Sequence, residues 1–326
     1  MPDASSGPGN LAPQAARLRQ RLLAAGSGQA PVAVMGIVNV TPDSFSDGGH
    51  FHKPEAALAQ ADRLVREGAE VLDLGAESTR PGAVAVTAEE EWARLEPVLE
   101  RIELQMASGP HQSPPFLSID TTKARVAEAA LSPRFPAPMA LINDVWGFQH
   151  DHRMASVVAA HGVMAVLMHN RPHLSSEQGQ ALPDRAGVLW ESFERFFDLS
   201  LTRAHQAGVV EEALLLDPGI GFGKTLAQNL EALALIPRLR RHYGLPVMVG
   251  ASRKSLFTRL LGRPLPDMAE RLPPTLAAHL HAAAGGACML RVHDVQAHVD
   301  ALAVQKALQL HRDSRETTER TEKRDA

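Results

Sequence analysis

Short apolar runs alternate with amphipathic helical patterns along most of the chain. Eight of these runs are rich in Val, Ile, Leu and Met, and each has the length of a buried strand. Continuous apolar strands are typical of a parallel sheet whose two faces are both covered. The predicted strands span residues 32–39, 71–75, 116–120, 140–144, 163–169, 214–217, 246–250 and 288–293.

The segments between these strands carry signals for helices. Pro54 is placed to open the helix after the first strand, and Gly68 to end it. After the second strand, Thr87 and Glu90 have the spacing of a capping box. A helix after each of eight strands predicts an α/β fold, a single (β/α)8 TIM barrel, over about residues 32–310. A doubly wound open sheet is the alternative, because it has the same alternation.

Two terminal segments lie outside this pattern and are predicted to be flexible tails. Residues 1–28 form an N-terminal arm, in which residues 11–25 carry three arginines among Ala and Leu. We interpret 11–25 as a helix docked under the domain or as an amphipathic transit peptide. Residues 311–326 are nearly all charged or polar, which predicts a disordered tail. The domain between the tails covers residues 29–310.

Composition narrows the function classes open to this chain of 326 residues. Hydrophobic residues make up 44% and charged residues 21%, which is enough to build a packed core. Aromatic residues are 4% and the net charge is −4, which argues against binding to nucleic acid or to an anionic membrane. The single cysteine, Cys288, excludes an internal disulfide. No apolar run approaches the ~20 residues of a membrane helix. We expect a soluble, cytoplasmic protein.

Polar residues end or follow almost every predicted strand. In a barrel the carboxyl ends of the strands meet at one mouth, where active sites lie. Any single such residue has a simpler interpretation as a helix N-cap, which we favour for Asp144. The residues are Asn39, Asp73, Asp120, Asn143, Asp144, His169, Asp217, Ser252, Lys254, Arg291 and His293. Their recurrence from strand to strand favours a binding site at the mouth.

Together with Arg80, which follows the second predicted strand, several of these residues represent two chemistries. The cationic group, which suits a polyanion such as phosphate, consists of Arg80, Lys254, Arg291 and His293. The acidic and amide group, which suits the N–H donors of a flat heterocycle, consists of Asp120, Asn143 and Asp217. Together they predict a phosphorylated heterocycle that loses its phosphate. The competing interpretation is that the acids only pair with the bases.

Two further motifs are weaker evidence of function. The segment PGIGFGKT at 218–225 has Pro218 where a Walker A loop needs its first glycine, so its glycines predict a tight turn that lets the backbone approach a ligand. His150 with His152, and His279 with His281, lack the spacing of a zinc helix and are predicted to be surface or packing residues.

The sequence resembles the family of dihydropteroate synthases, which are pterin-binding enzymes, over about residues 32–305. The segments that carry the resemblance occur in the family's order. They are MGIVNVTPDSFSDGG at 35–49, DLGAESTRPGA at 73–83, SIDTTK at 118–123, INDVWG at 142–147, LMH at 167–169, LDPGIGFGKT at 216–225, ASRKS at 251–255 and RVHDV at 291–295. The segment after His169 departs from the family pattern.

The resemblance implies a TIM barrel and one transferase reaction of folate biosynthesis, classified as EC 2.5.1.15. In that reaction 6-hydroxymethyl-7,8-dihydropterin diphosphate condenses with 4-aminobenzoate to give 7,8-dihydropteroate and diphosphate. The resemblance also implies Mg2+ as cofactor, a homodimer, and inhibition by sulfonamides, which mimic 4-aminobenzoate. We hypothesise a dissociative displacement in which the aniline nitrogen attacks late.

Site roles follow from the same resemblance. The pterin would be bound by Asp120, Asn143, Asp217 and Lys254. The diphosphate would be bound by Thr79, Arg291 and His293. The 4-aminobenzoate would be bound by Thr79, Arg80, Pro81, Phe222 and Ser255. The catalytic residues would be Asp217, Lys254 and Arg80, with Asn39 as the protein ligand of Mg2+.

Two related functions remain as alternatives at this point. A pterin-dependent methyltransferase module shares the barrel and the acidic pocket, but does not need the STRPG loop or the Arg291-x-His293 pair. A non-catalytic pterin-binding paralogue would not need intact Asn39, Arg80 and Lys254.

Overall fold

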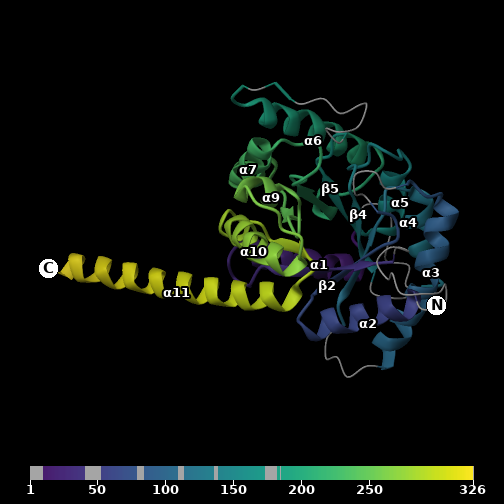
Figure 1. Cartoon of the computed structure of the whole chain (residues 1–326), viewed down its shortest axis with the longest axis horizontal. Helices are drawn as coiled ribbons and strands as arrows, with labels where there is room; N and C mark the ends of the chain where they lie inside the picture. The colour runs from purple at the N-terminus through teal and green to yellow at the C-terminus, as the bar shows by residue number, and fades with distance from the viewer. Residues whose placement is uncertain are drawn as a thin grey trace.

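Eight parallel strands form one sheet in the order β6-β5-β4-β3-β2-β1-β8-β7, with helices around it (Figure 1). The computed structural model describes residues 10–40, 53–78, 84–108, 114–135, 139–172, 182–183 and 185–325. The strands are β1 Ala33–Asn39, β2 Val71–Gly75, β3 Phe116–Asp120, β4 Met139–Asp144, β5 Met164–Met168, β6 Leu214–Asp217, β7 Met248–Val249 and β8 Met289–Val292. Each lies where the apolar runs predict a strand, and only β4 begins one residue outside its predicted range.

The two ends of the sheet meet, which closes it into a barrel. Leu216 of β6 forms a parallel bridge with Val247, just before β7. The Leu216 N–H donates to the Pro246 carbonyl at 3.0 Å. The predicted (β/α)8 barrel is therefore confirmed, and the open sheet is not what the chain forms.

One helix precedes β1, one follows β8, and the others lie between successive strands in the chain. The helices are α1 Pro13–Gly26, α2 Lys53–Arg66, α3 Ala88–Ser108, α4 Ala124–Ala130, α5 Met154–His161, α6 Val188–Gln206, α7 Leu226–Ala234, α8 Ile236–Tyr243, α9 Leu256–Leu261, α10 Met268–Ala284 and α11 Val295–Asp325. The capping box predicted before α3 is present, since the Glu90 N–H donates to Thr87 Oγ1 at 3.1 Å and the Thr87 N–H donates to Glu90 Oε2 at 3.0 Å. This reciprocal pair satisfies two of the backbone donors at the start of α3.

The barrel interior is apolar at the amino ends of the strands. Met35 and Met289 lie in one buried cluster there, and α1 adds Leu18 and Leu22 to the same cluster. Both leucines are fully buried. Arg21 of α1 binds Glu70, just before β2, through two parallel N–H···O bonds. The helix expected within 11–25 thus closes the bottom of the barrel.

The last helix of the chain extends beyond the barrel. α11 continues to Asp325, so it includes most of the tail predicted at 311–326, and it projects away from the barrel (Figure 1). The disorder of this charged tail stays a prediction from its composition. Its first turns are packed, since Val295 and Leu302 are buried, but Val304 and Leu308 are 61% and 67% exposed. The helical pattern of Val295 and Leu302 therefore ends before the helix does.

None of the described helices combines the length and the apolar composition that a bilayer crossing needs.

Candidate functional site

The predicted site residues on the first four strands lie at one level of the barrel. Parallel register places Asn39 beside Gly75, Gly75 beside Asp120, and Asp120 beside Asn143. Adjacent residues in a parallel register point to the same face of the sheet. A polar layer therefore sits on the apolar bottom of the barrel, at the carboxyl ends where sites of this fold form.

Arg291 is held between two carboxylates of this layer. Its Nε lies 2.6 Å from Asp73 Oδ2, and its Nη2 lies 2.6 Å from Asp120 Oδ2. Asp73 is fully buried and Arg291 is largely so, so these charge-assisted bonds form in a low-dielectric environment. The interpretation that acids only pair with bases therefore describes Asp73 and Asp120, although it does not describe Asp217.

Asp73 also fixes the orientation of Asn143. Asp73 Oδ2 accepts from Asn143 Nδ2 at 3.0 Å, and Asp73 Oδ1 accepts from Ser118 Oγ at 2.6 Å. Because a carboxylate can only accept, the amide nitrogen of Asn143 must face Asp73. Asn143 Oδ1 is buried and has no partner in the structure. A buried carbonyl oxygen of this kind is an acceptor that a ligand N–H would satisfy.

Asp217 ends β6 and begins a turn built from glycines. Its Oδ1 accepts from the Gly219 N–H at 2.7 Å. It makes no ion pair with another described residue. Gly219 has φ +66°, and a Cβ there would lie 2.0 Å from the His169 carbonyl oxygen, so no other residue fits. The turn thus brings the backbone after β6 against the end of β5, as the PGIGFGKT segment predicted.

A buried lysine stabilises this turn by hydrogen bonds to its backbone carbonyl oxygens. Lys224 is 4% exposed, and its Nζ donates to the carbonyl oxygens of Gly219 at 2.8 Å and of His169 and Phe222 at 3.2 Å. Three acceptors match the three donors of an ammonium group. Burial lowers the pKa of Lys224 to about 7, with Asp217 acting in the opposite direction.

Two predicted residues for different substrates meet at the mouth. Lys254 Nζ lies over the Phe222 ring, 4.0 Å from its centroid, which is a cation–π contact. Gly221, at φ +85°, lets the loop pass Lys254, whose Cδ would lie 3.1 Å from an added Cβ. The predicted pterin residue Lys254 and the predicted aminobenzoate residue Phe222 are therefore neighbours. Ser255 is exposed at the start of α9.

His293 is anchored to the loop that follows β7. Its backbone N–H donates to Ser252 Oγ at 3.2 Å, and its Nδ1 lies 2.9 Å from the same oxygen. The imidazole is half-buried. The segments after β7 and β8 therefore reach the mouth as one connected unit.

Burial raises the pKa of two carboxyls of the site. It raises the pKa of Asp217 to about 6, against the Gly219 N–H and the nearby Lys254, which both favour the ionised form. It raises the pKa of Asp120 to about 7, with the Arg291 guanidinium acting in the opposite direction. Both carboxyls therefore change charge near neutral pH, which is common at functional sites.

Three predicted residues, Thr79, Arg80 and Pro81, lie outside the described residues. The described residues on either side of them are tied to the barrel. Lys123 Nζ binds Glu77 Oε2 at 2.7 Å and Glu91 Oε2 at 2.6 Å. Glu77 Oε1 accepts from the Val86 N–H at 3.0 Å. Both ends of the loop after β2 are thus anchored.

Sequence reasoning did not assign roles to Asp73, Ser118, Ser252 and Lys224. The position of Asp73 inside an apolar strand was a signal, because a strand core does not select a carboxylate without a partner. Lys224 lies in the PGIGFGKT segment, and its burial has no signature in the sequence. Of the paired histidines, His150, His152 and His281 are exposed, whereas His279 is buried.

The donor set limits which metal this site can hold. Among the described residues no group of three or more His, Cys, Asp or Glu side chains is arranged around a common centre. Asn39, half-buried at the end of β1, offers one neutral oxygen. Mg2+ is a hard ion that keeps water ligands and is commonly held by one or two protein oxygens plus substrate phosphates. The residues therefore fit a Mg2+ that arrives with a phosphorylated substrate.

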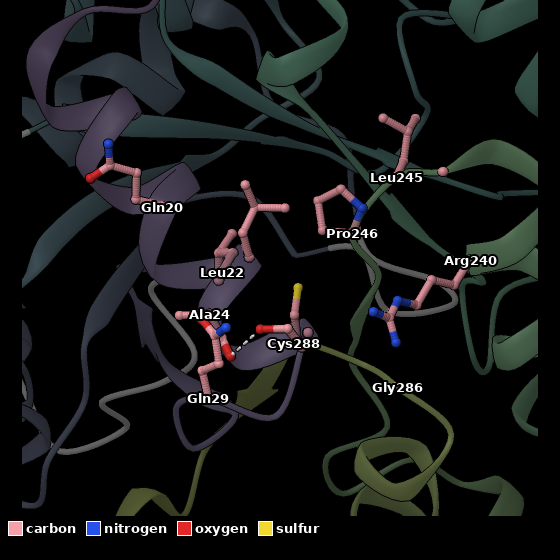
Figure 2. A pocket seen from close by; sticks show the side chains of 13 residues that line it. Gln20, Leu22, Ala24, Gln29, Arg240, Leu245, Pro246, Gly286 and Cys288 are labelled. Carbon is pink, nitrogen blue, oxygen red and sulfur yellow. Dashed lines mark hydrogen bonds between the residues drawn. The ribbon is translucent and has the colours of Figure 1, made fainter.

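A separate pocket lies at the opposite end of the barrel (Figure 2). It is lined by residues of α1 and by Leu245, Pro246 and Cys288, which precede β7 and β8. Cys288 is buried, and its thiol donates to the Val247 carbonyl at 3.4 Å. The amino-terminal face of this fold contributes to stability, and none of the predicted site residues reaches this pocket.

Comparison with known sequences identifies what this site is similar to. The sequence profile of a family described as "Pterin binding enzyme" matches residues 35–293. The dihydropteroate synthase of Bacillus subtilis strain 168 is 42% identical over 265 residues, which cover 81% of this chain and 84% of that protein.

Solved structures show the same similarity in three dimensions. The dihydropteroate synthase of Xanthomonas albilineans with 4-aminobenzoic acid matches with a TM-score of 0.74 at 44% identity, covering 86% of this chain and 94% of that one. A structure of the enzyme from the same organism in complex with 7,8-dihydropteroate matches with a TM-score of 0.71 at 42% identity, with the same coverage of 86% and 94%. The similarity therefore extends over the whole barrel.

Proposed function

We infer that this chain, which belongs to the pterin-binding enzyme family and within it to the dihydropteroate synthases, joins 6-hydroxymethyl-7,8-dihydropterin diphosphate to 4-aminobenzoate. The reaction gives 7,8-dihydropteroate and diphosphate, a step of folate biosynthesis. The observation that carries the proposal is the polar layer at the mouth, in which Asp217 and Asn143 Oδ1 are buried acceptors and the cationic side chains of Lys254 and Arg291 lie near Asp217. The methyltransferase and the non-catalytic paralogue are not favoured by any feature of this layer.

The acceptors of the layer suit the pterin. The aminopyrimidinone edge of a pterin presents N–H donors, and an ionised carboxylate accepts two parallel N–H bonds. Asp217 has this capacity once its single bond to Gly219 is counted, because a carboxylate has about four lone-pair sites. Asn143 Oδ1 supplies a further acceptor whose direction is set by Asp73. Asp120 and Lys254 complete the pterin set that we propose.

The leaving diphosphate would be bound on the cationic side of the mouth. His293, with its position set by Ser252, and Arg291 contribute from the end of β8. Arg291 already bonds Asp73 and Asp120 through Nε and Nη2, so its guanidinium connects Asp120 of the proposed pterin set to the diphosphate side. We propose that Asn39 and the diphosphate oxygens hold Mg2+. When bound, this ion would neutralise the charge of the leaving group.

The chemistry is a displacement at the methylene carbon of the pterin. The carbon–oxygen bond to the diphosphate breaks, the aniline nitrogen forms the new carbon–nitrogen bond, and one N–H proton is released. We propose that carbon–oxygen cleavage runs ahead of attack, because Asp217 can stabilise positive charge on the pterin. An aromatic amine is neutral near pH 7, so the reaction needs no strong base. Phe222 offers the aromatic surface of the aminobenzoate site, which Thr79, Arg80, Pro81 and Ser255 complete in the proposal.

We propose that the protein acts in the cytoplasm, as its composition indicates. We also propose that it requires Mg2+ and is a homodimer, as the resemblance to the family implies. Size-exclusion chromatography with light scattering measures the last directly, and a mass of one chain would contradict it.

The test of the function measures diphosphate release by the purified protein. Release should require dihydropterin diphosphate, 4-aminobenzoate and Mg2+ together, with dihydropteroate as the product. Excess EDTA should stop release and leave the melting temperature of the free protein unchanged, because no metal cage exists among the described residues. Pterin binding without turnover would contradict the synthase and favour the non-catalytic paralogue.

A further inference from the structure

Two buried histidines connect the outer helices to the segments that carry Lys254 and His293. His279 of α10 and His298 of α11 are 0% and 1% exposed. His279 Nδ1 lies 2.8 Å from His298 Nε2. The other nitrogen of each ring reaches backbone: His279 Nε2 lies 2.9 Å from Ala251 N, and His298 Nδ1 lies 2.6 Å from the Asp294 carbonyl oxygen.

One backbone donor determines the protonation of this relay. The Ala251 N–H can only donate, so His279 Nε2 carries no proton. His279 Nδ1–H must then donate to His298 Nε2, and His298 Nδ1–H must donate to the Asp294 carbonyl. Each bond has one donor and one acceptor only when both rings are neutral. Burial, followed by the proximity of the other imidazoles, lowers the pKa of His279 well below its usual value, and burial lowers that of His298.

The relay ends on the two segments that form the cationic side of the mouth. Ala251 begins the segment that leads through Ser252 to Lys254, and Asp294 follows His293 directly. A second link joins the same segments, since Arg253 Nε donates to Asp294 Oδ2 at 3.0 Å and a further N–H of this guanidinium bonds Asp294 Oδ1. The relay and this ion pair thus enclose the loop on both sides.

The loop between them needs support because its backbone is strained. Arg253 has φ +58°, a left-handed conformation that is unfavourable for a residue with a side chain. Its N–H donates to Thr275 Oγ1 at 3.2 Å, and its carbonyl accepts from Arg271 Nη1 at 3.2 Å. Both partners are on α10, the helix that also carries His279. α10 therefore holds the strained residue from the same side as it holds Ala251.

Packing alone does not account for the histidines. Two neutral imidazoles must be stripped of water, and apolar side chains of similar volume would fill the same space without that cost. Here the outer nitrogen of each ring forms a hydrogen bond with a main-chain atom of a segment that leads to the mouth. Buried polar groups that are fully bonded in this way define one position of the backbone.

We propose that His279 and His298 are positioning residues, which fix the backbone of residues 251–254 against 293–294 so that Lys254 and His293 face one ligand. This inference rests on the proposed function for the identity of that ligand, dihydropterin diphosphate.

The experiment compares three variants of the full chain. His279→Leu keeps the volume and removes the acceptor for Ala251. His279→Gln keeps a side-chain oxygen as acceptor and serves as the conservative rescue. His281→Leu makes the same change two residues further along α10, at an exposed position, and is the matched control. The dissociation constant for dihydropterin diphosphate is measured by calorimetry, with kcat and both KM values.

We expect binding by His279→Leu to weaken about tenfold, the equivalent of one hydrogen bond. His279→Gln should stay within about threefold of the wild type, and His281→Leu should equal it. The KM for dihydropterin diphosphate should rise more than kcat falls. A folded His279→Leu protein that binds this ligand as tightly as the wild type would overturn the proposal, whatever its melting temperature.

Two provisions keep the result decisive. If His279→Leu does not fold, His298→Leu is used, since it breaks the relay at its far end; unchanged binding in that variant overturns the proposal equally. Hydrogen exchange at residues 251–255 reports on the loop without any ligand, and it should quicken in His279→Leu but not in His281→Leu. A wild-type protein that does not bind the pterin diphosphate would contradict the proposed function, whereas unchanged exchange contradicts the positioning role.

Discussion

At the scale of single residues, the site separates carboxylates that are paired from one that is not. Asp73 and Asp120 both pair with the single guanidinium of Arg291, while Asp217 accepts one backbone N–H and makes no ion pair with a described residue. A buried and incompletely bonded carboxylate is unfavourable for the free protein and becomes favourable when a ligand supplies donors. Asp217 is for this reason the residue on which binding should depend most.

Replacing Asp217 by Asn tests this dependence. The amide keeps the shape and loses the charge, so kcat/KM for dihydropterin diphosphate should fall about ten- to a hundredfold, the equivalent of a charged hydrogen bond. The melting temperature should stay equal or rise, because the amide is cheaper to bury. Steady-state kinetics and thermal unfolding measure both. Asp267→Asn is the control, since the Asp267 side chain is exposed and makes no capping hydrogen bond. Unchanged kinetics in Asp217→Asn would refute the role of Asp217 in binding.

The raised pKa values of Asp217 and Asp120, about 6 and about 7, predict how activity depends on pH. The ionised forms bind the pterin, so kcat/KM should fall as the pH drops through the range from about 7 to 6. The stability effect has the opposite sign. The unfolded value is 3.8, so the folded state holds more protons between that value and the folded pKa, and this contribution to stability is lost as the pH rises through that window. An activity profile without an acid limb would contradict the assignment.

At the scale of elements, the turn after β6 depends on glycine. A Cβ at Gly219 would lie 2.0 Å from the His169 carbonyl oxygen, and φ is +66°. Gly219→Ala should therefore cost at least about 2 kcal/mol of unfolding free energy and lower turnover, because Asp217 and Phe222 flank the turn. Gly208→Ala is matched, since φ is +83° with nothing within 4 Å, and should cost about 1 kcal/mol. Denaturant unfolding measures both, and equal costs would contradict the steric argument.

α1 contributes to stability at the other end of the barrel. Leu22 is fully buried against the apolar bottom, whereas its neighbour Leu23 is 50% exposed. Leu22→Ala should lower the unfolding free energy by about 2–4 kcal/mol, and Leu23→Ala should change it by less than about 0.5 kcal/mol. Both variants should keep kcat, because the site lies at the opposite face. A loss of kcat in folded Leu22→Ala protein would show that the two faces are coupled.

At the scale of the whole molecule, the sequence predicts local structure better than it predicts long-range contacts. The eight strands were predictable because each is a continuous apolar run followed by a helix signal. The bond from Arg291 to Asp73 spans 218 positions, and no spacing in the sequence encodes it. Similarly, the polar strand ends predict a polar mouth. Which acid forms an ion pair and which remains available to a ligand depends on the tilt of the strands and on the depth of each residue in the barrel. The burial of Lys224 and His279 likewise follows only from packing.

The last turns of α11 extend beyond the part of the barrel on which its first turns pack. Leu302 is 5% exposed, whereas Val304, Leu308 and Leu310 are 60–67% exposed. Removing residues 313–326 should therefore change the unfolding free energy by less than about 0.5 kcal/mol and leave kcat unchanged, while Leu302→Ala should cost about 2 kcal/mol or more. Denaturant unfolding and steady-state kinetics measure these effects. Light scattering of the truncated chain completes the test, because a lower mass than that of the full chain would show that this helix end holds two copies together.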